Sequence, residues 1–191
     1  SEALKDEIAY WQATLAKPSA RLPRDFEGGI NTVASTQIVT VELEEEDTRA
    51  LLQDVPEVYN TRINDVLLAC LIDVLAPWCG QECVRLDLEG HGREELFEDV
   101  DLSRTIGWFT SIFPVALERS DADDHGVLLK SVKEQLRQIP QHGIGYGLLR
   151  YLGLDERIRG GLAEELKAAL AFNLLRQNDK IIREEDRWEW S

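Results

Sequence analysis

The most informative part of the sequence is Glu89-Gly90-His91-Gly92-Arg93-Glu94, followed closely by the segment from Asp101 to Val115. Immediately before it, residues 83–89 alternate between apolar and charged side chains, which predicts a β-strand. The apolar run of residues 110–117 predicts a second strand. We therefore expect an acidic, glycine-flanked strand end beside a second, apolar strand.

Apolar residues at three- and four-residue steps predict helices around these strands. The helices are expected at residues 2–16, 44–54, 61–76, 127–138, 148–152 and 161–169, and two further strands at 33–43 and 170–175. The glycine-rich segment Gly143–Gly147 is predicted to be a tight turn. Strands separated by helices indicate an α/β fold, with a mixed sheet covered by helices on one face.

The strongest helical pattern is that of residues 61–76. Seven residues fall on one stripe and predict a core helix with Cys70 on its apolar face: Ile63, Val66, Leu67, Cys70, Leu71, Val74 and Leu75. The first helix likewise places four apolar residues on one face: Leu4, Ile8, Trp11 and Leu15.

The composition fits one globular unit of 191 residues, of which 43% are hydrophobic and 30% charged. The net charge of −15 argues against nucleic acid as a partner, because such binding depends on Lys and Arg. No apolar run approaches the roughly 20 residues that span a bilayer, and the first residues lack a signal-peptide core. A cytoplasmic protein without membrane contact is therefore expected.

The three cysteines, an odd number, do not suggest a secreted disulfide framework. Cys79, Cys83 and His91 offer three zinc ligands in principle. Their spacing fits no standard zinc motif, and no fourth ligand is evident. We therefore predict free thiols and no metal site.

The polar face of the strand at residues 83–89 carries the side chains best suited to chemistry. Period-two geometry extends this face from Asp87 through Glu89 to His91, so the three side chains are expected to share one space. Carboxylates that lie close together raise each other's pKa, and a Glu tuned in this way exchanges protons near neutral pH. A solvent-exposed strand face that ends in a glycine turn explains the same pattern, and the residues alone favour that plainer interpretation.

Other polar and aromatic residues also allow two interpretations. Trp108 can line a channel for an apolar acyl group, with Thr110 supplying a hydroxyl, or both can belong to a buried strand edge. His125 and His142 are interpreted as loop and turn residues.

The segments Glu89–Glu94, Asp101–Val115, Gly143–Gly147 and Phe172-Asn173 occur in an order found in one protein family. Together they resemble the condensation-domain superfamily of nonribosomal peptide synthetases and, among its branches, the epimerization domains. The resemblance implies a chloramphenicol-acetyltransferase-like fold, in which two α/β halves meet at the active site. The family's His-His-x-x-x-Asp-Gly motif belongs to the first half and is absent here, so the chain resembles the C-terminal half.

This resemblance implies four parts. Residues 1–16 are expected to be the connecting helix from the N-terminal lobe, 17–31 a linker, 32–177 the C-terminal lobe and 178–191 a tail of unknown structure. Leu174 and Arg176 stand where the family's last motif has an aromatic residue and a glycine, which is a departure from the pattern beside Asn173.

The resemblance also implies an activity. An epimerization domain inverts the α-carbon of an aminoacyl or peptidyl thioester from L to D by acid/base proton transfer. The substrate is presented on the 4′-phosphopantetheine of a peptidyl carrier domain, and no cofactor is expected to bind directly. Glu89 is the predicted catalytic residue, and the predicted substrate-binding residues are His91, Trp108, Thr110, Tyr146 and Asn173.

The expected partners are the carrier domain, the N-terminal lobe and neighbouring synthetase domains. Two alternatives stay open: a fragment of a peptide-bond-forming condensation domain, and a catalytically silent module that docks carrier domains. Without the histidine motif, this chain alone is expected to be inactive.

Overall fold

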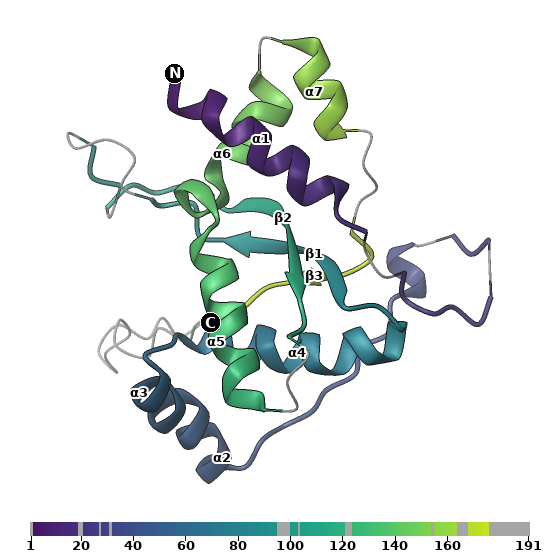
Figure 1. The fold of residues 1–191 in the computed structure, drawn as a ribbon, viewed down its shortest axis with the longest axis vertical. Helices are drawn as coiled ribbons and strands as arrows, with labels where there is room; N and C mark the ends of the chain where they lie inside the picture. The colour runs from purple at the N-terminus through teal and green to yellow at the C-terminus, as the bar shows by residue number, and fades with distance from the viewer. Residues whose placement is uncertain are drawn as a thin grey trace, which may run out of the picture.

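The centre of the protein is a three-stranded mixed sheet (Figure 1). The computed structural model describes residues 2–18, 21–26, 28–30, 32–94, 100–102, 104–120, 124–153, 155–163 and 168–175. Strand β1 (Cys83–Gly90) lies in the middle, antiparallel to β2 (Ser111–Glu118) and parallel to β3 (Ala171–Phe172). The strand order is therefore β2-β1-β3.

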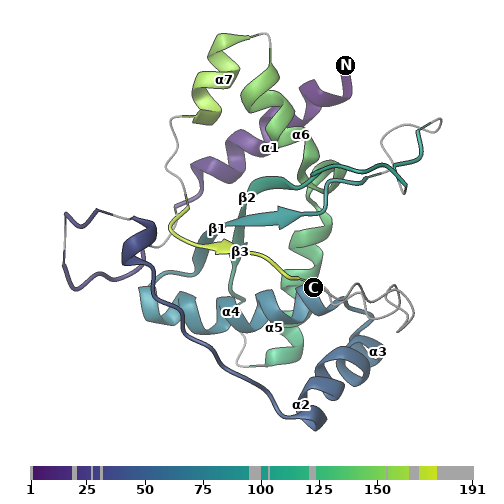
Figure 2. The same cartoon turned by 180° about the vertical axis from the view of Figure 1, so that it is seen from behind.

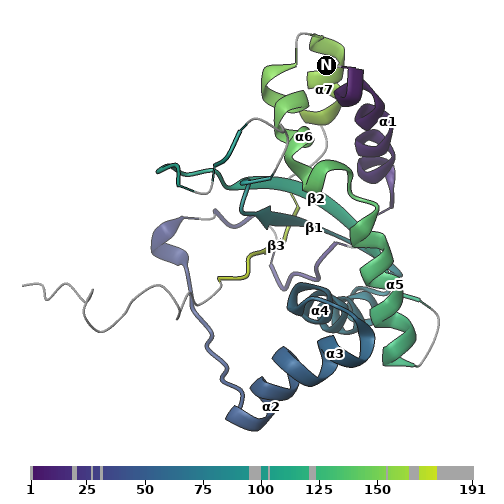
Figure 3. The same ribbon diagram turned by 90° about the vertical axis from the view of Figure 1, so that its left-hand side faces the viewer.

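One face of the sheet forms the core. Three cross-strand pairs of buried residues lie on it: Val84 with Leu117, Leu86 with Val115, and Leu88 with Phe113. Alternate residues of a strand point to the same face, so this register gathers the apolar side chains of both strands on one side. Helices lie on that side of the sheet (Figure 3), which confirms both predicted strands and the predicted α/β architecture.

Helix α1 (Glu2–Ala16) packs against β2 and confirms the first predicted helix. Its Trp11 is completely buried, with its ring beside those of Phe113 and Tyr146. The indole Nε1 of Trp11 donates a hydrogen bond of 3.1 Å to the buried carboxylate of Glu7, so the polar atom of the ring is satisfied inside the core.

A helical segment longer than predicted follows the linker. It comprises α2 (Glu45–Arg49), the π-helical turn η2 (Ala50–Asp54) and α3 (Val55–Tyr59), and it ends at Asn60 with φ +50°. Three acidic residues in its first turn suit the positive end of the helix dipole: Glu45, Glu46 and Asp47. The prediction of a helix at residues 44–54 is therefore confirmed.

Helix α4 (Ile63–Cys79) is the core helix that the sequence predicts, but its buried face is not the predicted stripe. The buried residues are Val66, Leu68, Ala69, Ile72, Leu75 and Ala76. Cys70 is exposed and Val74 is 67% exposed, so their prediction as core residues is wrong. The helix is apolar on nearly every side, and contact with the sheet decides which stripe is buried.

After α5 (His125–Arg137) the chain forms short helical turns: η3 (Pro140–Gly143), α6 (Ile144–Gly147), η4 (Leu148–Leu152) and α7 (Glu156–Ala163). The predicted helices at 127–138 and 148–152 are confirmed. The predicted tight turn at Gly143–Gly147 is wrong, because the reversal lies at residues 141–143 and Ile144 already begins a helix.

Residues 33–43 do not form the predicted strand. Val33–Ser35 is a 3-10 turn (η1), and residues 36–43 run extended along the outside of the molecule without pairing to any strand of the described chain (Figure 2). Their apolar side chains are open to solvent, with Val39 88% and Val41 84% exposed. The alternating apolar and polar residues therefore predicted the extended conformation correctly, but the segment does not pair with another strand of the described chain.

The last predicted strand is shorter than expected, with two residues in β3. The predicted tail from residue 178 lies outside the described residues. Within the described ranges, no helix combines the length and apolar character that crossing a bilayer requires.

Candidate active site

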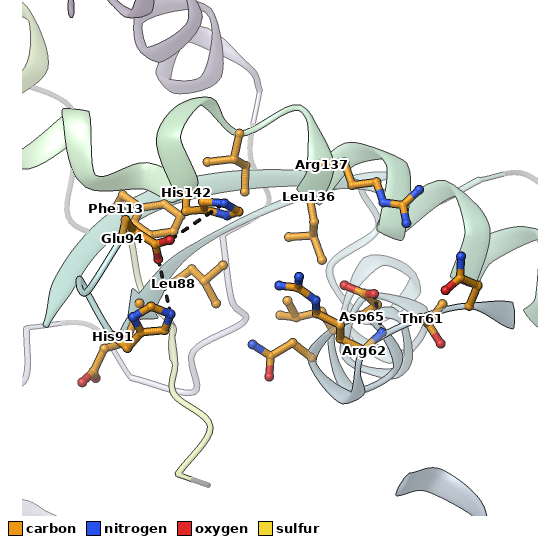
Figure 4. Close-up of a pocket in the computed structure, with 16 residues that line it drawn as sticks. Thr61, Arg62, Asp65, Leu88, His91, Glu94, Phe113, Leu136, Arg137 and His142 are labelled. Atoms are coloured by element: carbon orange, nitrogen blue, oxygen red, sulfur yellow. Dashed lines mark hydrogen bonds and ion pairs between the residues drawn. The ribbon is translucent and has the colours of Figure 1, made fainter. Parts of the chain in front are cut away.

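A cavity of about 810 Å³ lies where the carboxyl end of β1 approaches the start of α4 and the turn after α5 (Figure 4). Apolar side chains separate two polar ends of this cavity. The apolar residues are Leu68, Leu88, Phe113, Leu136 and Ile139. His91, Glu94 and His142 lie together at one end in Figure 4, and Thr61, Arg62 and Asp65 lie at the other. The cavity is also lined by Glu89, Asn60, Asn64 and Arg137.

Glu89, the predicted catalytic residue, is half-buried and lines this cavity. Its carboxylate makes no hydrogen bond or ion pair with any other side chain of the described chain. A carboxylate without a protein partner keeps both oxygens available for a ligand or a proton. An acid/base group needs a carboxylate that is available in this way.

His91 also lines the cavity, and its tautomer is fixed by the backbone. The backbone N–H of Arg93 donates a 3.0 Å hydrogen bond to His91 Nδ1, which must therefore carry a lone pair. The ring proton is then on Nε2, which lies 3.4 Å from Oε1 of Glu94. Nε2 of His91 thus faces a carboxylate.

Glu94 stands between two imidazoles (Figure 4). Its second oxygen lies 3.8 Å from Nε2 of His142, and its side chain is only 18% exposed. His142 comes from a segment 48 residues further along the chain, and its imidazole is 68% exposed. The interpretation of His142 as a plain turn residue therefore missed its place in the cavity.

A left-handed turn brings His142 to this position. Gln141 and His142 have φ of +45° and +51°, and Gly143 follows with φ +86°. A Cβ on Gly143 would overlap the ring of Phe113, so the turn rests directly on the cavity wall. Positive φ at two consecutive non-glycine residues is uncommon and clusters at functional sites.

Gly92 has a similar steric role in the hexapeptide. It has φ +66°, and a Cβ there would overlap the carbonyl oxygen of Phe109. Only glycine allows the end of β1 to approach the segment before β2 this closely.

Arg93 holds the same segment from the other side. Its guanidinium donates hydrogen bonds of 2.6 Å to the Leu102 carbonyl and 3.2 Å to the Gly107 carbonyl. It also stacks over the Phe109 ring, 4.3 Å from the ring centroid. Arg93 therefore anchors the loop before β2 to the hexapeptide. It is not one of the residues that line the cavity.

Three of the predicted site residues do not line the cavity. Trp108 is 88% exposed, and Thr110 is half-buried just before β2. Asn173 is exposed and follows Phe172, which pairs with Leu88 in the parallel register of β1 and β3. The register places Asn173 at the same end of the sheet as Glu89.

Tyr146 and Asp87 lie elsewhere. The buried Tyr146 donates its hydroxyl proton to the Leu162 carbonyl at 3.3 Å and accepts a 3.1 Å hydrogen bond from Arg150, so the hydroxyl is occupied by the fold. Burial raises the pKa of Asp87, while Arg150 and Arg85 oppose that change. Asp87 does not line the cavity with Glu89 and His91, so the expectation that the three share one space is correct for only two of them.

The far end of the cavity has unsatisfied polar atoms. The hydroxyl of Thr61 and the side-chain oxygen of Asn64 are buried without a hydrogen-bond partner in the described chain. Arg62 and Arg137 lie beside them on the wall, and Arg137 is paired with Glu134 at 3.1 Å. The cavity therefore has an end with imidazoles and a carboxylate, an apolar middle and a second polar end.

A comparison with protein-family models matches residues 1–187 to the condensation domain. The chain belongs to the condensation-domain family. It is 48% identical over 190 residues to one of the linear gramicidin synthase polypeptides of Brevibacillus parabrevis, covering 98% of this chain and 2% of that protein. It is 37% identical over 179 residues to bacitracin synthase 2 of Bacillus licheniformis, covering 94% of this chain and 7% of that protein. The chain thus spans a small part of the curated relatives it matches.

Among solved structures, this condensation-family chain is similar to the epimerization domain from the third module of tyrocidine synthetase B. The match has a TM-score of 0.79 and 37% identity, and it covers 90% of this chain and 38% of that chain. A condensation domain of the calcium-dependent antibiotic synthetase shares the fold alone, with a TM-score of 0.58 and 16% identity. The resemblance stated from the sequence is confirmed, as is the chloramphenicol-acetyltransferase-like fold class.

Proposed function

We propose that this chain is part of an epimerization domain and inverts the α-carbon of an aminoacyl or peptidyl thioester. The substrate is carried on the 4′-phosphopantetheine of a carrier domain, in the cytoplasm. One observation supports this above the others: the carboxylate of Glu89 is half-buried, unpaired within the described chain, and lines a cavity at the end of β1. The similarity to an epimerization domain of known structure supports it independently.

The chemistry needs two acid/base groups on opposite faces of one carbon. One group takes the α-proton and leaves an enolate of the thioester, and the other returns a proton to the opposite face. Glu89 is the group that this chain contributes. The second group comes from the amino-terminal lobe, which in this family carries the His-His-x-x-x-Asp-Gly motif. A carrier domain and that lobe are therefore the partners that the proposal requires.

The test is α-proton exchange with deuterated solvent, catalysed by the chain joined to its amino-terminal lobe. Glu89→Gln keeps the size of the side chain and removes the acid/base function, so exchange should fall by at least about 100-fold. Glu118→Gln is the matched control, because Glu118 lies at the other end of the paired strands, with its side chain 55% exposed and bound to Lys17. That variant should exchange at the wild-type rate.

The same experiment separates the competing functions. A condensation domain joins two aminoacyl substrates and needs no exchange of the α-proton, so peptide formation without exchange would identify that activity instead. A docking module would bind the carrier domain and catalyse neither reaction. Wild-type exchange in Glu89→Gln would remove Glu89 from the mechanism.

A further inference from the structure

We propose that the end of the cavity around Arg62 binds the phosphodiester of the carrier domain's 4′-phosphopantetheine. The inference rests on the proposed function, because that function places the substrate on such an arm. It concerns residues that the acid/base chemistry does not use, and it assigns them to an anionic group of the ligand that is remote from the reacting carbon.

Arg62 presents a cation to the cavity. It immediately precedes the first residue of α4 and lines the cavity, and in Figure 4 its guanidinium extends from the helix towards the middle of that space. This guanidinium makes no hydrogen bond or ion pair with any group of the described chain. Asp65 accepts the backbone N–H of Arg62 at 2.7 Å and so caps the helix. The N–H donors of the Arg62 side chain are therefore available to a ligand.

An arginine without a carboxylate partner stands out in so acidic a protein. The chain has 36 acidic residues against 21 basic ones. Several other arginines of the described chain form ion pairs with carboxylates: Arg49 with Asp54, Arg119 with Asp73, and Arg137 with Glu134. The planar guanidinium group matches the oxygens of a phosphate with two parallel hydrogen bonds. A phosphate group is therefore a ligand for which Arg62 is well suited.

Two neighbouring polar atoms suit other parts of the same arm. The hydroxyl of Thr61 and the side-chain oxygen of Asn64 belong to residues that line the cavity, and both atoms are buried without a hydrogen-bond partner in the described chain. Such atoms cost free energy unless a ligand or water supplies the missing hydrogen bond. Beyond its phosphate, phosphopantetheine carries a hydroxyl and amide groups, whose O–H and N–H donate to oxygens of this kind.

The exposure of this end of the cavity favours a phosphodiester over an acidic side chain of the substrate. The phosphodiester joins the arm to the carrier domain, so in the complex it lies where two protein surfaces meet. Arg62 and Arg137 both line the cavity and are exposed, so this end is open to solvent. Arg137 is already bound to Glu134 at 3.1 Å, which leaves Arg62 as the available cation of the two.

The first test measures binding to the chain joined to its amino-terminal lobe. The probes are 4′-phosphopantetheine and pantetheine, which differ only in the phosphate, and titration calorimetry should show tighter binding of phosphopantetheine. Arg62→Gln should weaken the binding of phosphopantetheine at least about tenfold, because a charge-assisted hydrogen bond is lost, and should leave that of pantetheine unchanged. Higher salt should narrow the difference between the two probes, because ions screen an exposed charge.

Two further variants make the result specific. Arg49→Gln is the matched control, since it removes the same charge from a different surface, where Arg49 is bound to Asp54 at 3.2 Å; both affinities should stay at the wild-type value. Arg62→Lys keeps the charge without the planar guanidinium, and its affinity for phosphopantetheine should fall between those of the wild type and Arg62→Gln.

A second readout is α-proton exchange with a leucyl and a glutamyl thioester of phosphopantetheine. Arg62→Gln should raise the KM of both substrates alike, at least about tenfold, because the phosphate is common to them. If the variant impairs only the glutamyl substrate, Arg62 recognises the substrate side chain and the inference is wrong.

Two outcomes of the binding test also contradict the inference. Equal affinity of the wild type for the two probes shows that this cavity has no phosphate site. A preference for phosphopantetheine that persists in Arg62→Gln places the phosphate elsewhere. The proposed function fails separately: a joined protein that prefers phosphopantetheine through Arg62 but does not exchange the α-proton keeps this site and is no epimerase.

Discussion

Replacement of Gly143 by alanine should destabilise the fold, because this position combines two steric demands. Its φ is +86°, a conformation that residues with a Cβ rarely adopt. A Cβ built there would also overlap three carbon atoms of the Phe113 ring. Since Phe113 is buried in the core beside Trp11, the ring has little room to move away.

The size of the effect follows from these two demands. A left-handed conformation costs a residue with a Cβ about 1–2 kcal/mol. Forcing an extra methyl group into a packed core costs about 1–3 kcal/mol more. Gly143→Ala should therefore lower the free energy of unfolding by roughly 2–5 kcal/mol, a large part of the stability of an ordinary domain.

Equilibrium urea unfolding measures this loss, and Gly147→Ala is the matched control. Gly147 lies four residues further along the same segment, has helical φ and ψ of −62° and −39°, and has open space around a Cβ. Alanine should stabilise that position by up to about 1 kcal/mol, because it is the better helix former. If both variants unfolded within about 0.5 kcal/mol of the wild type, neither the turn at residues 141–143 nor its packing on Phe113 would hold as described.

Two further predictions concern charged residues of the strand end. Arg93→Lys should speed hydrogen exchange of the loop before β2, because an ammonium group cannot bind two loop carbonyls and stack on Phe109 together; unchanged protection measured by mass spectrometry would contradict this. Asp87→Asn tests the raised pKa of Asp87, which burial lifts above 3.8 against the pull of Arg150 and Arg85. Because the pKa is raised in the folded protein, the fold favours the protonated form of Asp87. The free energy of unfolding of the wild type, relative to that of the variant, should therefore fall as pH rises from below 3.8 through the raised pKa, and it should stay constant at higher pH. If urea unfolding gave the same pH dependence of the free energy of unfolding for wild type and variant, the predicted loss of stability would be wrong.

The sequence predicted those elements whose hydrophobic pattern is compatible with only one buried face. Residues 83–89 alternate because one face of β1 is buried, while β2 beside it reads as an apolar run in which Phe113, Pro114 and Val115 are all buried. Helix α1 has one apolar stripe and one packing surface, so Trp11 and Leu15 were placed correctly. In these elements local periodicity and tertiary contact agree.

Other elements could not be predicted because the deciding contact lies far away in the sequence. Helix α4 offers two apolar stripes, and only its contact with the sheet selects Leu68 and Ile72 over Cys70 and Val74. Residues 36–43 alternate like a strand, yet nothing in that segment states which strand it should join. Glu94 lies close to His142 because of a turn in which Gln141 and His142 have positive φ. Neither residue type indicates positive φ in the sequence, so this contact could not be predicted.

The two glutamates of the Glu89–Glu94 hexapeptide look equivalent in the sequence, but their surroundings give them different chemistry. Glu94 lies between His91 and His142, with one carboxylate oxygen towards each imidazole. Glu89 has no such partner in the described chain, so both of its oxygens are available to a ligand. The residues between them set this difference: Gly92 allows the close approach, and Arg93 ties down the loop and fixes the His91 tautomer. A substitution of Gly92 or Arg93 should therefore shift Glu94 and the imidazole of His91 beside it.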